Sequence, residues 1–252
     1  ARCINGLIPR SYKGELTGRI LIQGQEIRSL SLARISQLIG TVLQDPERQI
    51  LGTKVLNEVA FGLENLSLSR DEILERADAA MQRLKISHLR LRETFHLSGG
   101  EKQKVALAGV LAMQPSLLML DEPLASLDPA SAEETLAIVR QLADDGMTIL
   151  LIEHRVEGLL RIHPEQTIYM TGGQIRYFGP TAGLEEVVDY HEIKLPAEKV
   201  IERAARSKPT PPTAPRLTGR DPSARPIVRF ENVSFGYEAE RSVLQGINLG
   251  IG

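Results

Sequence analysis

The chain has 252 residues, of which 42% are hydrophobic and 25% are charged, so it can bury one sizeable core and its length suits one domain with an extra subdomain. Its formal net charge of −2 and isoelectric point near 6.3 give no electrostatic reason to expect a nucleic-acid partner. No apolar stretch approaches the ~18 residues that a membrane-spanning helix needs, and the single cysteine, Cys3, excludes an internal disulfide and fits a reducing cytosol.

Apolar runs alternate with helical patterns through the central part of the chain, which predicts a mainly parallel sheet covered by helices. The predicted strands lie near residues 18–23, 39–44, 117–121, 148–153, 167–171 and 174–178. The predicted helices lie near residues 54–62, 69–85, 98–113 and 130–145. We therefore expect an α/β fold, a three-layer mainly parallel sheet with a helical subdomain at about 54–115 and an antiparallel β portion.

The strand predicted from Ile39 to Leu43 is an apolar run that ends in Gln44. In open α/β sheets, ligands bind at the carboxyl ends of the strands. The neutral side chain of Gln44 is able to ligate Mg²⁺ or to position a water at this edge, and it is also compatible with ordinary loop chemistry.

Ser98 and Glu101 have the spacing of a capping box, which predicts that a helix begins here and runs toward Met113. Gly99 and Gly100 occupy its first turn, where each glycine costs up to about 1 kcal/mol relative to alanine. The glycines would allow a phosphate to approach bare N–H groups at the positive end of the helix. The alternative is an ordinary capped helix that tolerates two glycines.

Two carboxylates end the next apolar run, because Leu117 to Leu120 is followed by Asp121 and Glu122. An uninterrupted apolar run is typical of a parallel strand buried on both faces. One carboxylate can hold Mg²⁺, usually through water, and its neighbour can orient or deprotonate an attacking water. An acidic turn leading into Pro123 is the alternative.

A further strand, predicted from Thr148 to Ile152, ends in Glu153 and His154. A histidine at this edge could contact a γ-phosphate, although a lone histidine after a strand is more often a surface residue. Residues 125–128, which end in Asp128, predict a tight turn after the acidic pair.

Taken together, these segments resemble the nucleotide-binding domain of ATP-binding-cassette (ABC) proteins. The matching segments are Gln44 as the Q-loop, Leu97 to Gln103 as the signature motif, Leu117 to Glu122 as Walker B, Ser126 to Asp128 as the D-loop and His154 as the H-loop. Residues 43–49 (LQDPERQ), 58–65 (EVAFGLEN) and 152–155 (IEHR) further resemble the ATPase subunits of energy-coupling-factor importers, which take up vitamins or transition-metal ions.

The resemblance implies a P-loop NTPase fold of the ABC type, with ATP and Mg²⁺ as cofactors. By the resemblance, Asp121 and Gln44 would be the metal-binding residues, and Gln44 would also couple the site to the transporter. Glu122 would be the general base and His154 would contact the γ-phosphate. The remaining nucleotide-binding residues are then Ser98, Gly99, Gly100, Glu101, Asp128 and Tyr237.

The chain departs from the family in one respect, because no G-x-x-x-x-G-K-[ST] phosphate-binding loop (Walker A) occurs in it. Residues 1–7 resemble the later part of the helix that this loop normally starts, and no initiating methionine precedes them. We therefore expect a fragment that does not hydrolyse ATP by itself, taken from a parent protein that does.

Residues 207–226 are rich in proline, which predicts an extended, semi-rigid linker. Residues 227–252 resemble the opening strands of a second copy of the domain, so the expected organisation is a first ATPase domain at 1–206, a linker, and the start of a second. In the family an aromatic residue at the position of Tyr237 stacks on adenine; packing inside a β-hairpin is equally compatible. We also expect residues 227–252 to pair with the strand near 18–23.

The expected partners are a second ABC ATPase domain and a transmembrane coupling subunit, at the cytoplasmic face of the membrane, and no nucleic acid. By the resemblance, the helical subdomain meets the membrane subunit, with Val55 to Leu66 as the contact candidate. A soluble tandem cassette acting on ribosomes or DNA is the second hypothesis, and the proline-rich linker argues against it. The third hypothesis is a fragment without function.

Overall fold

The computed structural model describes residues 1–154, 159–160, 162–188, 228–238 and 241–251. It divides into two compact units, Ala1–Arg203 and Ala204–Gly252. Most of the predicted site residues belong to the first unit.

A parallel sheet of three strands forms the centre of the first unit, in the order β3 (Ile39–Val42), β4 (Leu117–Asp121) and β5 (Thr148–Ile152). The register pairs Val42 with Leu120 and Asp121 with Ile152, so all three strands end at one edge. In β4, Leu118, Met119 and Leu120 are at most 1% exposed, as expected for a strand covered on both faces.

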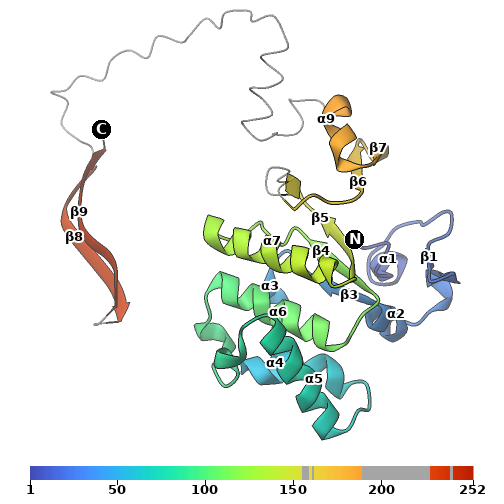
Figure 1. Cartoon of the computed structure of the whole chain (residues 1–252), viewed down its shortest axis with the longest axis horizontal. Coiled ribbons are helices and arrows are strands. Elements are labelled where there is room, and N and C mark those ends of the chain that lie inside the picture. Colours follow the sequence, from blue (N-terminus) through green and yellow to red (C-terminus); the bar gives the residue numbers. More distant parts are fainter. Residues whose placement is uncertain (155–158, 161, 189–227, 239–240, 252) are drawn as a thin grey trace, which may run out of the picture. The chain divides into compact units, whose positions relative to one another are not determined.

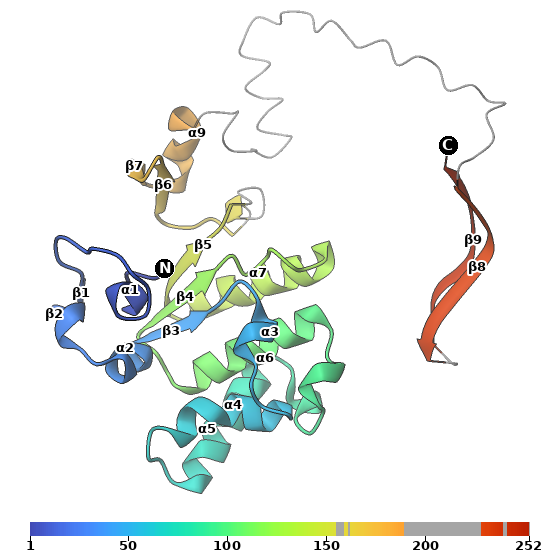
Figure 2. The same cartoon turned by 180° about the vertical axis from the view of Figure 1, so that it is seen from behind.

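Two apolar clusters cover the two faces of this sheet, because successive side chains of a strand point to opposite faces. Leu118 and Leu120 pack with α6 (Gly99–Ala112) and α7 (Pro129–Asp144). Met119 packs with Ile35 and Leu38 of α2 (Leu32–Leu38). Helix α7 lies in front of the sheet in Figure 1 and behind it in Figure 2, which completes a three-layer arrangement.

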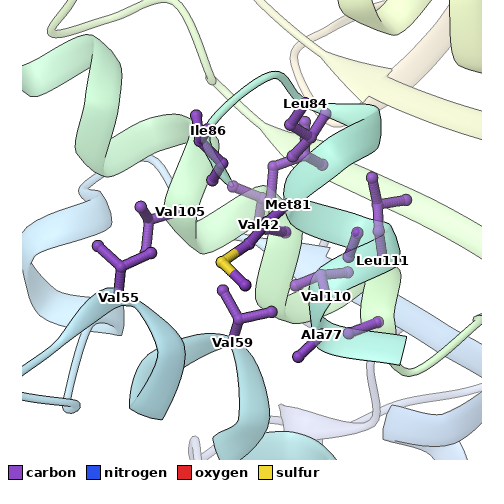
Figure 3. Packing of buried hydrophobic residues seen from close by; sticks show 14 of the residues in the cluster. Val42, Val55, Val59, Ala77, Met81, Leu84, Ile86, Val105, Val110 and Leu111 are labelled. Atoms are coloured by element: carbon purple, nitrogen blue, oxygen red, sulfur yellow. The ribbon is translucent and has the colours of Figure 1, made fainter. Parts of the chain in front are cut away.

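The helical part consists of α4 (Val55–Glu64), α5 (Arg70–Arg83) and α6. Figure 3 shows Met81 of α5 among Val59 of α4 and Val105 of α6, and all three are 0% exposed. The same cluster includes Val42 and Leu118 of the sheet, so the helical part and the sheet share one continuous core.

The other elements are short helices and antiparallel hairpins. In the first unit they are α1 (Leu7–Arg10), β1 (Leu21–Ile22), β2 (Gln25–Glu26), α3 (Pro46–Gln49), β6 (Thr167–Thr171), β7 (Gln174–Gly179) and α9 (Leu184–Val187), with 3-10 turns at Ile27–Ser29, Ser87–Leu89, Thr94–His96 and Thr181–Gly183. In the second unit, β8 (Val228–Glu238) pairs with β9 (Arg241–Ile251).

The predicted α/β fold is confirmed, with the parallel sheet, the helical part and the antiparallel portion all present. The strand predicted at 18–23 is shorter than expected, because Gln23 and Gly24 both have positive φ and turn the chain after Ile22. Within the described residues, β1 pairs with β2 and β8 pairs with β9, so each segment forms a hairpin, and the pairing of residues 227–252 with the strand near 18–23 stays a prediction. None of the helices that the structure describes is long and apolar enough to cross a membrane.

Candidate functional site

Glu122 lies between two other predicted site residues at the carboxyl edge of the sheet. The Gln44 amide donates from Nε2 to Glu122 Oε2 over 3.0 Å. On the other side, His154 Nε2 lies 2.9 Å from Glu122 Oε1. These three side chains follow β3, β4 and β5, so the shared register of the strands brings residues 78 and 32 positions apart into contact.

The backbone around Glu122 holds its carboxylate at this edge. The Glu122 N–H donates to the Ile152 carbonyl over 2.9 Å and extends the β4–β5 ladder by one residue. Glu122 has a φ of 50°, a left-handed conformation that is strained for a residue with a side chain. Glu153, from the neighbouring strand end, accepts from the Leu124 N–H over 3.0 Å and fixes the turn that follows.

The side chains of Glu122, His154 and Asp121 differ in how much of their surface is exposed to solvent. The side chain of Glu122 is 26% exposed, whereas that of His154 is 81% exposed. Asp121, the last residue of β4, is half-buried beside them. A half-buried carboxylate next to an open imidazole is suited to act on a group that arrives from solvent.

Asp121 and Gln44 supply the oxygen donors that Mg²⁺ prefers. A carboxylate, an amide oxygen and water match its ligand chemistry, and Mg²⁺ is usually bound by one or two carboxylates together with substrate phosphates. The residues present therefore fit the ion. The side-chain N–H of Gln44 donates to Glu122, so the side-chain oxygen of Gln44 remains available to bind a ligand.

Ser98 and Glu101 form the predicted capping box at the start of α6. Ser98 Oγ accepts from the Glu101 N–H over 3.3 Å, and Glu101 Oε2 accepts from the Ser98 N–H over 2.7 Å. Burial raises the pKa of Glu101, but the hydrogen bonds from Ser98 and the charges of Arg92 and His88 outweigh it, so the pKa lies below its ordinary value of 4.5. The turn from Ser98 to Glu101, the Ser98 turn, is thus held by the Glu101 carboxylate, which stays ionised to a lower pH than an ordinary glutamate.

This direction predicts how pH acts on the Ser98 turn. A carboxylate whose pKa is lowered by folding stabilises the protein above its unfolded pKa, and that contribution is lost as pH falls through the folded pKa. In wild type, the contribution of Glu101 should therefore be complete above pH 4.5 and decline below it. The variant Glu101→Gln, which cannot ionise, should lose less stability between about pH 5 and pH 3, as measured by urea unfolding. Parallel pH profiles for the two proteins would contradict this assignment.

The two glycines of the turn have different surroundings. A Cβ placed on Gly100 would lie 2.8 Å from Ser131 Oγ, so Gly100 lets α6 approach the start of α7. The nearest atom to a Cβ on Gly99 is the Ser126 carbonyl oxygen at 3.9 Å. Packing against Ser131 therefore gives Gly100 a structural reason, and the approach of a phosphate to the N–H groups of Gly99 and Gly100 stays a prediction.

Asp128 is the N-cap of α7. Its Oδ1 accepts from the N–H groups of Ala130 at 3.0 Å and Ser131 at 3.1 Å, and its Oδ2 accepts from Ser131 Oγ at 2.5 Å. The hydrogen bonds from the Ser131 side chain and backbone lower the pKa of Asp128. The N-cap hydrogen bonds of α7 are sufficient to explain why a carboxylate stands at position 128. Contact between Asp128 and a nucleotide stays a prediction.

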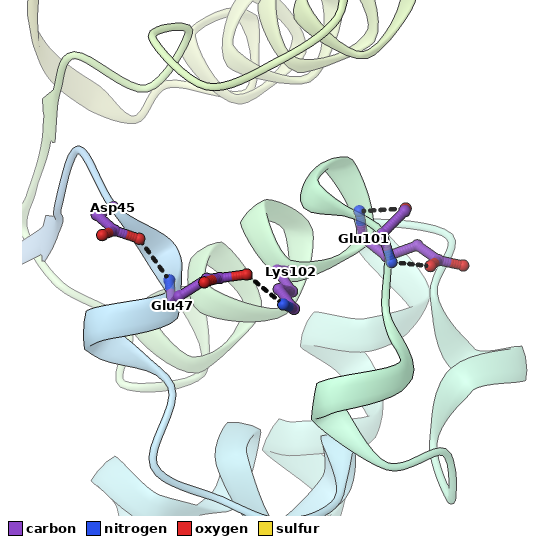
Figure 4. A network of polar contacts seen from close by, with 5 residues as sticks. Asp45, Glu47, Glu101 and Lys102 are labelled. Atoms are coloured by element: carbon purple, nitrogen blue, oxygen red, sulfur yellow. Dashed lines mark hydrogen bonds and ion pairs between the residues drawn. The ribbon is translucent and has the colours of Figure 1, made fainter.

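A cavity of about 320 Å³ joins three of the predicted segments. It is lined by residues 44–47, by Gly99, Lys102 and Gln103, and by Pro123, Ser126 and Leu127. Lys102 of α6 forms an ion pair with Glu47 of α3, as Figure 4 shows. Sequence reasoning missed this pair, because two charges 55 positions apart carry no local signal.

Tyr237 lies within β8 of the second unit. Its side chain falls outside what the structure describes, and its contact with adenine stays a prediction.

The comparisons with known proteins agree on one family. The sequence profile of the ABC transporter family matches residues 2–125. A putative ABC transporter ATP-binding protein of Pyrococcus abyssi is 40% identical over 202 residues, which cover 79% of this chain and 72% of that protein. A putative ABC transporter ATP-binding protein of Lactiplantibacillus plantarum is 33% identical over 273 residues, covering 98% of this chain and 48% of the relative.

Among solved structures, CbiO1 from Clostridium perfringens, described as part of the ABC transporter complex CbiONQ, matches with a TM-score of 0.68 and 30% sequence identity. The match covers 81% of this chain and 76% of that chain. The chain spans about half the length of several curated relatives, which are named as putative ABC transporter ATP-binding proteins.

Proposed function

Because this chain belongs to the family of ABC transporter ATP-binding proteins, we propose that it is part of an ATPase that drives import across a membrane. The observation that carries the proposal is the position of Glu122 between Gln44 and His154 at the end of three parallel strands. A carboxylate held by two neighbours at this edge is a suitable general base for a water that attacks a phosphate.

Each residue of the edge has a task in this proposal. Glu122 accepts the proton of the attacking water, and Gln44 keeps the Glu122 carboxylate oriented through its amide N–H. His154, which is open to solvent, donates a hydrogen bond to the γ-phosphate. When bound, Mg²⁺ would neutralise charge on the phosphate oxygens, with Asp121 and Gln44 as its protein ligands.

The Ser98 turn has a different task, because we propose that it serves a nucleotide held by a second ABC ATPase domain. Ser98 and Gly99 would face that nucleotide at the amino end of α6, where N–H groups and the helix dipole favour negative charge. Gly100, Glu101 and Asp128 would support the same surface. Nearly the whole chain aligns with 48% of the Lactiplantibacillus relative, so that relative is long enough to hold a second such domain.

We further propose that the importer is of the energy-coupling-factor type. The strings at 43–49 and 58–65 and the likeness to CbiO1, a part of a CbiONQ transporter complex, support this subfamily. A transmembrane coupling subunit would then bind the chain at the cytoplasmic face of the membrane, and the transported solute would be a vitamin or a metal ion. The helical part from Val55 to Leu66 is the proposed contact.

Removal of Mg²⁺ tests the proposed activity. We expect the full-length protein to release phosphate from ATP at about 1 per second or faster with Mg²⁺ and to lose this activity when EDTA is added. Excess Mg²⁺ added back to the same sample should restore the rate, which controls for damage by the chelator. Phosphate release that is unchanged by EDTA would refute the proposal.

A further inference from the structure

One link between the site and the helical part is buried. Glu58 of α4 and Thr94 of the Thr94–His96 turn are only 8% and 7% exposed, and both are polar. A buried carboxylate or hydroxyl destabilises the fold unless hydrogen bonds satisfy it. The partners of these two side chains therefore show what they hold in place.

Both side chains hold the same loop, residues 51–53, which connects α3 to α4. Glu58 Oε2 accepts from the N–H groups of Leu51 at 2.7 Å and Gly52 at 2.6 Å. Thr94 Oγ1 donates to the Gly52 carbonyl over 2.7 Å. Gly52 is thus held at its N–H by α4 and at its carbonyl by the turn that precedes Ser98.

The position of Gly52 has no room for a side chain. A Cβ there would lie 2.5 Å from the Glu58 nitrogen and 2.8 Å from the Glu58 Cα, and both of these are backbone atoms. Backbone bonds add to the connection, because the Thr94 N–H donates to the Thr53 carbonyl over 3.1 Å and Lys54 forms an antiparallel bridge with Glu93.

One end of this connection reaches Gln44. The Gln49 side chain accepts from the Leu43 N–H over 2.9 Å and donates to the Thr41 carbonyl over 3.2 Å, which ties α3 to the strand before Gln44. At the other end, the Leu97 N–H donates to the Thr94 carbonyl over 3.4 Å, directly before the Ser98 cap.

We propose that Gly52, Glu58 and Thr94 form a brace that fixes the Ser98 turn relative to Gln44, which makes Glu58 and Thr94 positioning residues. The functional part of this inference rests on the proposed ATPase activity. The Lys102–Glu47 ion pair also connects the segment after Gln44 with the helix that begins after Ser98. Because Glu47 is 67% exposed, solvent screens this pair, so the buried brace is the contact that fixes the two segments relative to each other.

Hydrogen exchange on the 252-residue chain tests the brace without ATP. In Thr94→Val, which keeps the shape and loses the hydroxyl, the N–H groups of Ser98 and Glu101 should exchange about five-fold faster. Thr94→Ser should restore the wild-type rates. Thr135→Val is the matched control, because Thr135 is 4% exposed and donates to the Ser131 carbonyl over 2.9 Å, outside the brace.

Faster exchange at Ser98 and Glu101 in Thr94→Val, absent in Thr135→Val, would support the brace. Faster exchange confined to residues 52–54, or spread over the whole chain, would overturn it. If Thr94→Val does not fold, Glu58→Gln gives the same readout, because it keeps the shape and weakens two charge-assisted hydrogen bonds.

A kinetic measurement on the full-length protein tests the functional part. Thr94→Val should lower kcat about five-fold with KM for ATP unchanged, and Thr94→Ser should restore kcat. An unchanged kcat, or an equal change in kcat and KM, would overturn the positioning role. Absence of ATP hydrolysis by wild type would instead refute the proposed function, and the exchange result would still decide the brace.

Discussion

Replacing Glu122 by glutamine is expected to lower ATP hydrolysis by the full-length protein about 10²- to 10⁴-fold, the usual contribution of a general base. Glutamine has nearly the same shape and can keep contacts with Gln44 and His154, but it cannot accept a proton. The loss should therefore appear in kcat, measured as phosphate release, while the equilibrium binding of ATP stays near that of wild type.

Glu75→Gln is the matched control, because Glu75 is exposed on α5 and away from the sheet edge. It should leave both phosphate release and ATP binding unchanged. If Glu122→Gln kept more than about a tenth of the wild-type rate, Glu122 would not be the base, and another group at the edge would have to take the proton.

Met81→Ala is expected to destabilise the 252-residue chain by about 2–5 kcal/mol. Met81 is 0% exposed and lies at the centre of the cluster in Figure 3, so its removal would leave a cavity among α4, α5 and α6. The free energy of unfolding in urea, followed by circular dichroism, measures the loss. Because the cluster also includes sheet residues, helical and sheet signals should be lost in one transition.

Met170→Ala provides the same chemical change at a different place. Met170 of β6 is 58% exposed, so its truncation should change stability by no more than about 0.5 kcal/mol. Equal effects of the two substitutions would contradict the buried position of Met81. Separate transitions for helices and sheet would show that the helical part does not share its core with the sheet.

The sequence was sufficient to predict the fold class and the edge of the sheet at which Gln44, Glu122 and His154 meet. Each of the strands before Gln44, Glu122 and His154 is a mainly apolar run followed by polar residues, and parallel strands end at one edge. The membership of the ABC family, inferred from the same segments, is confirmed by the profile and by the relatives. The roles of the site residues stay predictions.

The tertiary contacts around this edge could not be predicted from sequence. Gly100 matches the pattern of a phosphate-binding turn, yet a Cβ added there would lie against Ser131, 31 positions away, and only folding reveals that proximity. In the sequence, Glu58 stands out only as the first residue of the string at 58–65, and nothing there predicts its two N–H donors, which belong to a loop without any recognisable pattern. Local spacing predicts caps and strand ends, but it does not predict which loop a buried side chain will hold.

The left-handed backbone at Glu122 has a consequence for engineering this protein. Glycine or asparagine would relax a φ of 50° and would stabilise the fold, whereas glutamate adopts this conformation at a cost of about 1 kcal/mol or more. A screen that selects for thermal tolerance alone would therefore favour the loss of the carboxylate on which the proposed activity depends. Stability and activity are opposed at this one residue, so a stabilised form of the protein should be sought with Glu122 held fixed.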